Sequence, residues 1–248
     1  MVEFYLGTHV TSWLRRYKLP FFVSQRTLGR VKTLHPTLDK WMLDSGGFSE
    51  LSINGRWTVS PHKYVLSVRR YANEMGNLRA AAVQDWMCEP VILKKTGLTI
   101  KQHQANTIKS YLELKSLGPW LPWMPVLQGW DKSDYLRHAD MYDHANIDLT
   151  SLPIVGVGSV CRRQATKEAV DIIKSLSQLG IKLHGFGVKL QGLKQMAHYL
   201  DSADSLAWSY GARYSPPLPG CRGHINCANC YVYAEQWYQR IVTMLKDA

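Results

Sequence analysis

Lys40-Trp-Met-Leu-Asp-Ser-Gly-Gly-Phe-Ser-Glu50 is an apolar run that ends in a carboxylate and is followed by two glycines and an aromatic ring. This order predicts a buried strand that delivers Asp44 to the rim of a pocket. Gly46 and Gly47 would let the backbone approach a ligand closely, because glycine has no side chain to obstruct it. Phe48 offers a flat face for stacking. The alternative is that Asp44 only anchors a buried loop.

Working outward, eight apolar segments of this kind can form strands, at residues 4–8, 21–25, 40–45, 78–86, 123–129, 152–159, 182–188 and 205–210. Amphipathic helical patterns occupy several of the gaps, at 61–75, 99–117, 166–179, 192–200 and 231–245. The clearest begins with Ser60 as N-cap and Pro61 in the first turn. Strands that alternate with helices favour an α/β fold of the (β/α)8 TIM-barrel type. An open doubly wound sheet, or a hairpin between the first two segments, is the alternative.

Composition limits the class of protein. A chain of 248 residues that is 46% apolar can form one domain, so residues 1–248 are expected to be a single barrel domain. The net charge of +11 favours a polyanionic partner such as nucleic acid, with a merely basic soluble protein as the alternative. No apolar run of membrane-spanning length and no signal-peptide pattern occurs, so we expect a cytoplasmic protein without a membrane partner.

Polar residues and glycines gather where the expected strands end. In a barrel of parallel strands the carboxyl ends meet at one face, and the chemistry is concentrated there. The motifs at these ends are Asp44-Ser-Gly-Gly-Phe48, Gln84-Asp85-Trp86, Gln128-Gly129-Trp130, Gly156-Val-Gly-Ser159, His184-Gly-Phe-Gly187 and, just before the last strand, Asp201-Ser-Ala-Asp204. This set predicts a pocket for a flat, polar ligand.

Such groups suit a purine. Guanine presents N–H donors that a carboxylate accepts, and a carbonyl oxygen to which a glutamine amide or a backbone N–H donates. Two further carboxylates can divide nucleophilic and acid–base work. Each residue also has a structural alternative. Asp85 can cap the following helix, Gln128 can bind loop backbone, and His184 can be a core histidine with satisfied hydrogen bonds.

Four metal-ligand side chains stand at intervals of three residues near the C-terminus: Cys221, His224, Cys227 and Cys230. Thiolates with an imidazole in a closed tetrahedral set favour Zn²⁺ in a structural site. Residues 215–235 are therefore expected to be a zinc-binding segment inserted near the C-terminus of the barrel domain. A remote histidine in place of His224 is the alternative: His9, His35 or His62. An iron–sulfur cluster is the alternative to zinc. The two cysteines outside this cluster, Cys88 and Cys161, are expected to be structural thiols.

Taken together, these features resemble the tRNA-guanine transglycosylase superfamily. The resemblance covers about residues 40–230 and rests on motifs in the family's order: Asp44-Ser-Gly-Gly-Phe48, Asp85, Gln128-Gly129, Gly156-Val-Gly158, His184-Gly-Phe-Gly187 and the cysteine cluster. Family members are zinc-containing (β/α)8 barrels. The resemblance implies a pentosyltransferase that exchanges guanine in a polynucleotide for a 7-deazaguanine through a covalent glycosyl–aspartate intermediate.

By position, the resemblance also implies residue roles. Asp44 resembles the acid–base aspartate, and Asp204 matches the nucleophile best, with Asp201 as the fallback. Surface capping is the alternative for both Asp201 and Asp204. Asp85 resembles the carboxylate that reads the guanine edge. The other implied base-binding residues are Phe48, Gln128, Gly129, Gly158, His184 and Gly185.

Two departures from the family pattern stand out. The family spacing is Cys-x-Cys-x₂-Cys with a downstream histidine, whereas here the first gap is longer and no histidine follows Cys230. The usual Pro-Thr-Arg after the nucleophile is replaced by Trp208-Ser-Tyr-Gly-Ala-Arg213. The compact chain is most similar to the DpdA-type branch, which acts on DNA and occurs in bacterial modification clusters and phages. DNA and a free 7-deazaguanine are therefore the implied partners, in a host cytoplasm if the chain is phage-encoded, and a tRNA enzyme is the alternative.

Cationic side chains are expected to hold the phosphate backbone. An N-terminal basic stretch and several strand-end loops supply them: Arg15, Arg16, Lys18, Arg26, Arg30, Lys32, Arg162, Arg163, Arg213 and Arg222. Two other classes of function stay open from the residues alone. One is a glycosylase that sends water to the same intermediate, and the other is a non-catalytic zinc-containing module that binds nucleic acid.

Overall fold

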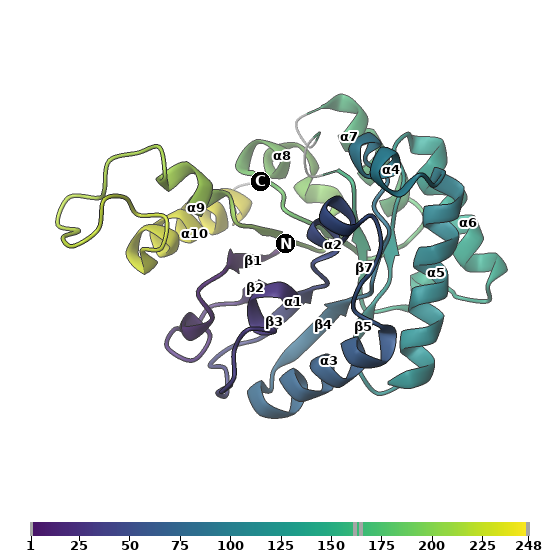
Figure 1. The fold of residues 1–248 in the computed structure, drawn as a ribbon. Helices are drawn as coiled ribbons and strands as arrows, with labels where there is room; N and C mark the ends of the chain where they lie inside the picture. The colour runs from purple at the N-terminus through teal and green to yellow at the C-terminus, as the bar shows by residue number, and fades with distance from the viewer. Residues whose placement is uncertain (1, 161–162, 164–165, 247–248) are drawn as a thin grey trace.

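The computed structural model describes residues 2–160, 163 and 166–246, so Cys161 and Arg162 lie outside the described residues. All strands of the described part form one parallel sheet in the order β5-β4-β3-β2-β1-β9-β8-β7-β6. They are β1 (Glu3–Thr8), β2 (Phe21–Ser24), β3 (Trp41–Asp44), β4 (Leu78–Ala82), β5 (Trp123–Met124), β6 (Val126–Leu127), β7 (Val155–Val157), β8 (Leu183–Gly185) and β9 (Ser202–Ser205). The two edge strands, β5 and β6, are consecutive in the chain, so the sheet is a nearly closed barrel (Figure 1). The expected α/β barrel is confirmed.

Pro125 divides the expected strand 123–129 into β5 and β6. Proline has no backbone N–H and cannot donate to the ladder of a sheet. Its carbonyl still accepts from the Gly156 amide at 2.8 Å. Because β5 pairs with β4 and β6 pairs with β7, this interrupted strand joins the two sides of the barrel.

Helices cover the outside of the barrel (Figure 1). In α3 (Pro61–Met75) the Ser60 hydroxyl accepts from the Lys63 amide and Pro61 lies in the first turn, as the sequence predicts. The other helices are α1 (Gln25–Leu28), α2 (Gly47–Asn54), α4 (Pro90–Thr96), α5 (Ile100–Leu117), α6 (Lys132–His144), α7 (Lys167–Ser177), α8 (Leu190–Met196), α9 (Ala207–Ala212) and α10 (Tyr231–Lys246), with short 3-10 turns at Thr11–Trp13, Leu149–Ser151 and Ala197–Tyr199.

The first strands have no long crossover helix. β2 pairs with β1 in parallel, with Leu6 opposite Phe21, so the two strands are not a hairpin. The C-terminal helix α10 packs on this side of the barrel instead. Its Trp237 and Tyr238 rings lie 5.8 and 6.0 Å from the ring of Phe4. The end of the chain therefore covers the strand with which the fold begins.

The expected last strand, 205–210, is wrong. β9 ends at Ser205, and helix α9 follows it. Trp208 and Ala212 are buried on one face of that helix, and the Trp208 indole donates to the Gly7 carbonyl at 2.8 Å. The four-residue spacing is helical, and the indole hydrogen bond fixes this face against β1. As a result, Asp204 lies near the carboxyl end of its strand instead of before it.

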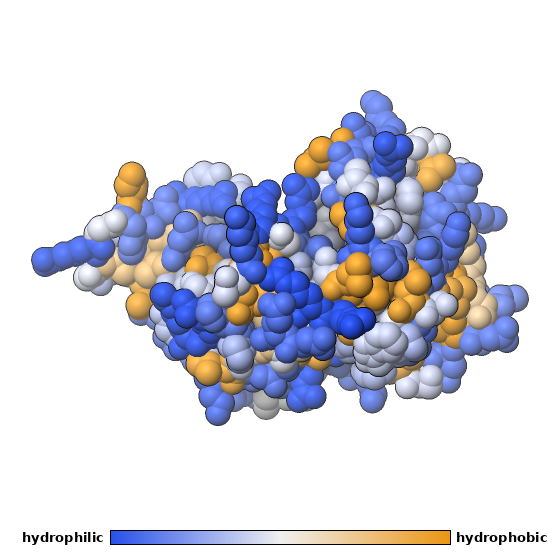
Figure 2. Space-filling model, turned by 60° about the horizontal axis from the view of Figure 1, so that its bottom comes forward, coloured by the Kyte–Doolittle hydropathy of each residue, from blue (hydrophilic) through white to orange (hydrophobic). Residues whose placement is uncertain are grey.

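The loop 213–230, between α9 and α10, extends away from the barrel at the left of Figure 1. Figure 2 shows the molecule with the bottom of the Figure 1 view turned forward. Hydrophilic residues cover most of this face, and a run of the most hydrophilic ones crosses its middle (Figure 2). Hydrophobic residues gather to the right of the middle of this face, with smaller groups elsewhere (Figure 2). No helix in the described part of the chain has the length and apolar character that a membrane crossing requires.

Candidate active site and metal cluster

Three carboxylates from distant parts of the chain line one cavity. Asp44 is the last residue of β3, Asp85 follows β4, and Asp204 lies in β9. The cavity has a volume of about 260 Å³ and lies at the carboxyl ends of the strands. Its other lining residues are Gly7, Thr8, His9, Phe22, Ser24, Thr27, Met87, Phe186, Gly187 and Leu206. Parallel strands bring these residues together because they all end at the same face.

Asp44 carries hydrogen bonds from the Ser24 hydroxyl and the Gly46 amide. Gly46 has a φ of +80°, a left-handed conformation that glycine adopts without strain, and it begins α2. Burial raises the pKa of Asp44 above its ordinary value, and the charge of Asp204 adds to the rise against the two hydrogen bonds. A carboxyl group with a raised pKa can hold a proton and release it during a reaction.

Asp85 is buried and hydrogen-bonded on both carboxylate oxygens. Oδ1 accepts from the Ser45 hydroxyl at 3.0 Å, and Oδ2 accepts from the side-chain amide of Gln128. Burial, and then the charge of Asp44, raise the pKa of Asp85 to about 7 in spite of these bonds. Each carboxylate oxygen can accept a second hydrogen bond, so Asp85 can still accept from a ligand in the cavity.

Asp204 is held by a backbone amide and a histidine. Its Oδ1 accepts from the Gly187 N–H at 3.0 Å and lies 3.3 Å from Nε2 of His184. The Nδ1 atom of the fully buried His184 lies 2.8 Å from the Ser202 hydroxyl. If Ser202 donates to Nδ1, the Nε2–H group of His184 donates to Asp204. This arrangement orients one carboxylate at the cavity wall, as a nucleophile requires.

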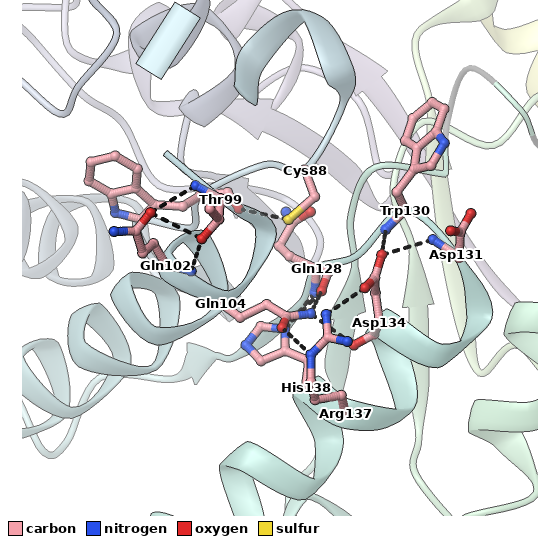
Figure 3. A network of polar contacts seen from close by, with 11 residues as sticks. Cys88, Thr99, Gln102, Gln104, Gln128, Trp130, Asp131, Asp134, Arg137 and His138 are labelled. Atoms are coloured by element: carbon pink, nitrogen blue, oxygen red, sulfur yellow. Dashed lines mark hydrogen bonds and ion pairs between the residues drawn. The ribbon is translucent and has the colours of Figure 1, made fainter. Parts of the chain in front are cut away.

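Gln128 lies next to Asp85 and is fully buried. Its side-chain amide donates to Asp85, and its Oε1 accepts from the Ser159 hydroxyl at 2.7 Å. Its backbone is held between two helices (Figure 3). The Gln128 N–H donates to Nδ1 of His138 on α6 at 2.8 Å, and the Gln104 amide on α5 donates to the Gln128 carbonyl at 2.7 Å. These contacts fix the orientation in which the NH₂ group faces Asp85.

The four predicted metal ligands come together in the loop before α10. The ligand atoms of Cys221, His224, Cys227 and Cys230 all lie within 4.8 Å of one another. The Cys221 and Cys230 sulfurs are 3.7 Å apart, and Nε2 of His224 is 3.4 Å from the Cys227 sulfur. Three thiols and an imidazole in this arrangement can hold one metal ion. The group contains none of the remote histidines His9, His35 and His62.

The model of the DpdA family, described as DeoxyPurine in DNA protein A, matches residues 1–248. The chain belongs to the DpdA family. Its members are DNA enzymes that resemble tRNA-guanine transglycosylases. A search of the curated proteins found no match. The resemblance inferred from the motifs is confirmed, and it extends over the whole chain.

Three predicted base-binding residues of this DpdA-family chain do not reach the cavity surface. Gln128, Gly129 and Gly158 are not among its lining residues in the described part of the chain. The Gly158 N–H donates to the Leu127 carbonyl at 3.0 Å, and the Gly158 carbonyl accepts from the Tyr135 hydroxyl at 2.7 Å. A Cβ atom on Gly158 would lie 2.1 Å from the Gln128 amide nitrogen. The glycine thus leaves room for the glutamine that contacts Asp85.

The rings at the cavity are ones that the sequence did not single out. Phe22 and Phe186 line it, whereas Phe48, in the first turn of α2, does not. Phe22 stacks on His184 with ring centroids 5.2 Å apart. His184 and Gly185 are buried in β8 and do not line the cavity either. The sequence did contain a signal for one of these rings. Phe186 directly follows β8 and belongs to the strand-end motif His184-Gly-Phe-Gly187.

Proposed function

We propose that this chain exchanges a guanine base in DNA for a free 7-deazaguanine, through a covalent bond between the deoxyribose and Asp204. One observation carries the proposal: Asp44, Asp85 and Asp204 line a single cavity in a member of the DpdA family. A surface that only held nucleic acid would gain nothing from three converging carboxylates, because they repel phosphate. A nucleophile, an acid–base group and a base-reading group account for all three.

Asp85 is the group that we assign to the guanine edge. Its remaining lone pairs accept from N1–H and the exocyclic amine, which guanine and 7-deazaguanine share. Phe22 and Phe186 offer flat faces to the ring. A cavity of about 260 Å³ suits one small heterocycle. Buried residues then support base binding indirectly, through the positions of Asp85 and Asp204: Gln128, Gly129, Gly158, His184 and Gly185.

In the first step an oxygen of Asp204 attacks C1′ of the target nucleotide. The C1′–N9 bond breaks and its electron pair leaves with guanine. Asp44 gives its proton to the departing base, and its raised pKa favours the protonated form that this requires. The products of the step are free guanine and a glycosyl ester on Asp204.

In the second step 7-deazaguanine occupies the same cavity. Asp44, now ionised, takes the proton from N9, and N9 attacks C1′. The bond between C1′ and Asp204 breaks, which returns Asp204 as a carboxylate and Asp44 as an acid. Because the ester keeps the glycosidic bond energy, the exchange needs no nucleotide cofactor. The target base must leave the helical stack before either step, since C1′ is inaccessible within it.

Zinc is the metal that we propose for the cluster. With a Zn–S distance of about 2.3 Å, two sulfurs of a tetrahedral site lie about 3.8 Å apart. The Cys221 and Cys230 sulfurs are 3.7 Å apart, which fits. Four protein ligands leave no open position, so the ion would hold the loop against α10 and take no part in the chemistry.

The test is incubation of the protein with DNA or with tRNA, each in the presence of candidate 7-deazaguanines, followed by mass spectrometry of the nucleosides. The expected product is a 7-deazaguanine deoxynucleoside in DNA, with one guanine released for each base inserted. Abasic sites as the only product would identify a glycosylase. Modification of tRNA alone would identify the tRNA enzyme, and unchanged nucleosides with every base would contradict base exchange.

A further inference from the structure

Helix α9 and its end expose two tyrosines. Tyr210 and Tyr214 are 64% and 75% exposed, and their rings are 5.2 Å apart. The described residues include every aromatic side chain of the protein, and among them only Trp120 is comparably exposed. Aromatic rings that are exposed to water lack the favourable free energy that burial of their surface would give. A pair of such rings therefore indicates a surface that is covered when a ligand binds.

These tyrosines continue a stripe that starts in the cavity. Leu206 lines the cavity at the beginning of α9 and is itself exposed. Leu206 is the N-cap of α9, and Tyr210 lies four residues further on the same side of the helix, while Trp208 and Ala212 are buried on another side. Tyr214 lies in the turn just beyond α9, where its ring is next to that of Tyr210. Tyr210 lies about 6 Å beyond Leu206 along the axis. That advance corresponds to about two stacked nucleotides of a single strand.

The charge of this region matches a nucleic-acid strand. No aspartate or glutamate occurs between residues 205 and 234. Arg213 stands between the two tyrosines in sequence, Arg222 follows on the loop, and both are exposed. Arginines neutralise phosphates, and exposed aromatic rings stack on bases, so the two together are typical of surfaces that bind single-stranded DNA.

We infer that Tyr210 and Tyr214 form a stacking platform for the unpaired bases next to the target guanine. The inference rests on the proposed function, because a target guanine bound in the cavity would bring the neighbouring nucleotides of its DNA strand to the two tyrosines. Extrusion of a base removes a stacking partner from its neighbours. The two tyrosine rings replace that partner, and the surface therefore favours single-stranded or locally opened DNA.

The test uses a single-stranded DNA oligonucleotide with one guanine and the fluorescent base 2-aminopurine one or two positions from it. The protein carries Asp204→Asn so that no exchange occurs. Binding is expected to quench 2-aminopurine. The double change Tyr210→Ala and Tyr214→Ala should abolish the quenching and weaken binding at least about five-fold, which corresponds to about 1 kcal/mol for one stacked base. Tyr210→Phe with Tyr214→Phe should retain both effects, because the ring does the stacking.

Trp120→Ala is the matched control, since Trp120 is equally exposed but precedes β5 at the opposite end of the barrel. It should bind as the unaltered protein does. Unchanged quenching and affinity in the alanine pair would overturn the platform, as would an equal loss in the phenylalanine pair or in Trp120→Ala.

Base exchange is measured separately, in protein with Asp204 intact. The alanine pair should raise the KM for DNA and leave kcat unchanged. If the unaltered protein exchanges no base but shows tyrosine-dependent quenching, the proposed function fails and the platform stands. If exchange occurs and binding does not depend on the tyrosines, the platform fails and the function stands.

Discussion

Asp44, Asp85 and Asp204 share a small cavity and influence one another. Burial is the largest cause of the raised pKa of both Asp44 and Asp85, and in each case a neighbouring carboxylate adds to it. Ionisation of all three would place like charges together in a poorly solvated space. The cavity therefore favours a state in which at least one of the three carboxyl groups is protonated. The proposed reaction begins in such a state, with the proton on Asp44.

Asp204→Asn is expected to lower base exchange by more than about a thousandfold, because an amide of the same shape is not a nucleophile. Asp201→Asn is the control. Asp201 lies just before β9, where its Oδ2 accepts from the Leu183 amide at 2.8 Å, and an asparagine oxygen can accept the same bond. Incorporation of labelled base measures both variants. A normal rate in Asp204→Asn, or a loss confined to Asp201→Asn, would exclude Asp204 as the nucleophile.

The proposed base recognition by Asp85 depends on pH. The carboxylate form accepts from guanine, so kcat/KM for DNA should rise as the pH increases through about 7, the pKa of Asp85. Asp85→Asn should remove this rise and lower kcat/KM at every pH. The measurement is a pH profile of single-turnover exchange. An unaltered rise in the asparagine variant would assign the ionisation to another group.

Asp85 should also affect stability. Its pKa is raised in the folded protein from an ordinary value of 3.8 to about 7, so the folded state binds this proton more tightly than the unfolded state does. The resulting stabilisation is fully present below about pH 4 and is lost as the pH rises to about 7, with a magnitude of at most about 4 kcal/mol. Urea unfolding at pH 5 and pH 8 should show a smaller decrease for Asp85→Asn than for the unaltered protein.

At the scale of elements, α9, loop 213–230 and α10 form a unit that is attached to the barrel on its β1 side. Cys227 packs with Ala212 and Ala228 in a small cluster of its own, separate from the main core. The Ser209 hydroxyl donates to the Ala228 carbonyl at 2.8 Å and connects α9 to the loop. Because the loop has so little apolar contact, we expect a metal ion bound by the four ligands to be what orders it.

Removal of the metal by a chelator is expected to loosen the loop and leave the barrel folded. Trypsin should then cleave faster after the exposed Arg213 and Arg222, while the far-ultraviolet circular dichroism changes little. Cys227→Ala should lose its bound metal, as measured by elemental analysis. Cys88→Ala is the control, because Cys88 is equally buried but lies outside the cluster. Full metal content in Cys227→Ala would contradict the proposed ligand set.

At the scale of the whole molecule, the net charge of +11 favours a polyanion such as the proposed DNA partner. Affinity for DNA should fall about tenfold or more between 50 and 200 mM salt if at least three phosphates are neutralised. Replacement of the exposed Arg30 and Lys32 by glutamine should reduce the slope of log K against log salt. Replacement of Lys101 and Lys109, exposed on the outer helix α5, is the control and should leave the slope unchanged. Equal slopes in both variants would show that Arg30 and Lys32 do not neutralise DNA phosphates.

Local patterns in the sequence predicted the elements that depend on neighbours along the chain. Ser60 and Pro61 begin α3 as expected, and the apolar run before Asp44 is a strand, because caps and short apolar runs act within a few residues. The segment after Asp204 was misjudged. Its aromatic and small residues suit either a strand or a helix, and burial of Trp208 against Gly7 selects the helix.

The alternation of strands and helices, the acids at the strand ends and the spacing of the candidate metal ligands could all be predicted from the sequence, because each depends on residues that are close together in the chain. Which side chains contact one another could be known only from the three-dimensional fold. It placed Phe186 at the cavity and Gln128 behind Asp85, and it assigned His184 to Asp204. These contacts depend on how barrel strands align across many intervening residues, and that alignment is set by packing of the whole core, which no local pattern records.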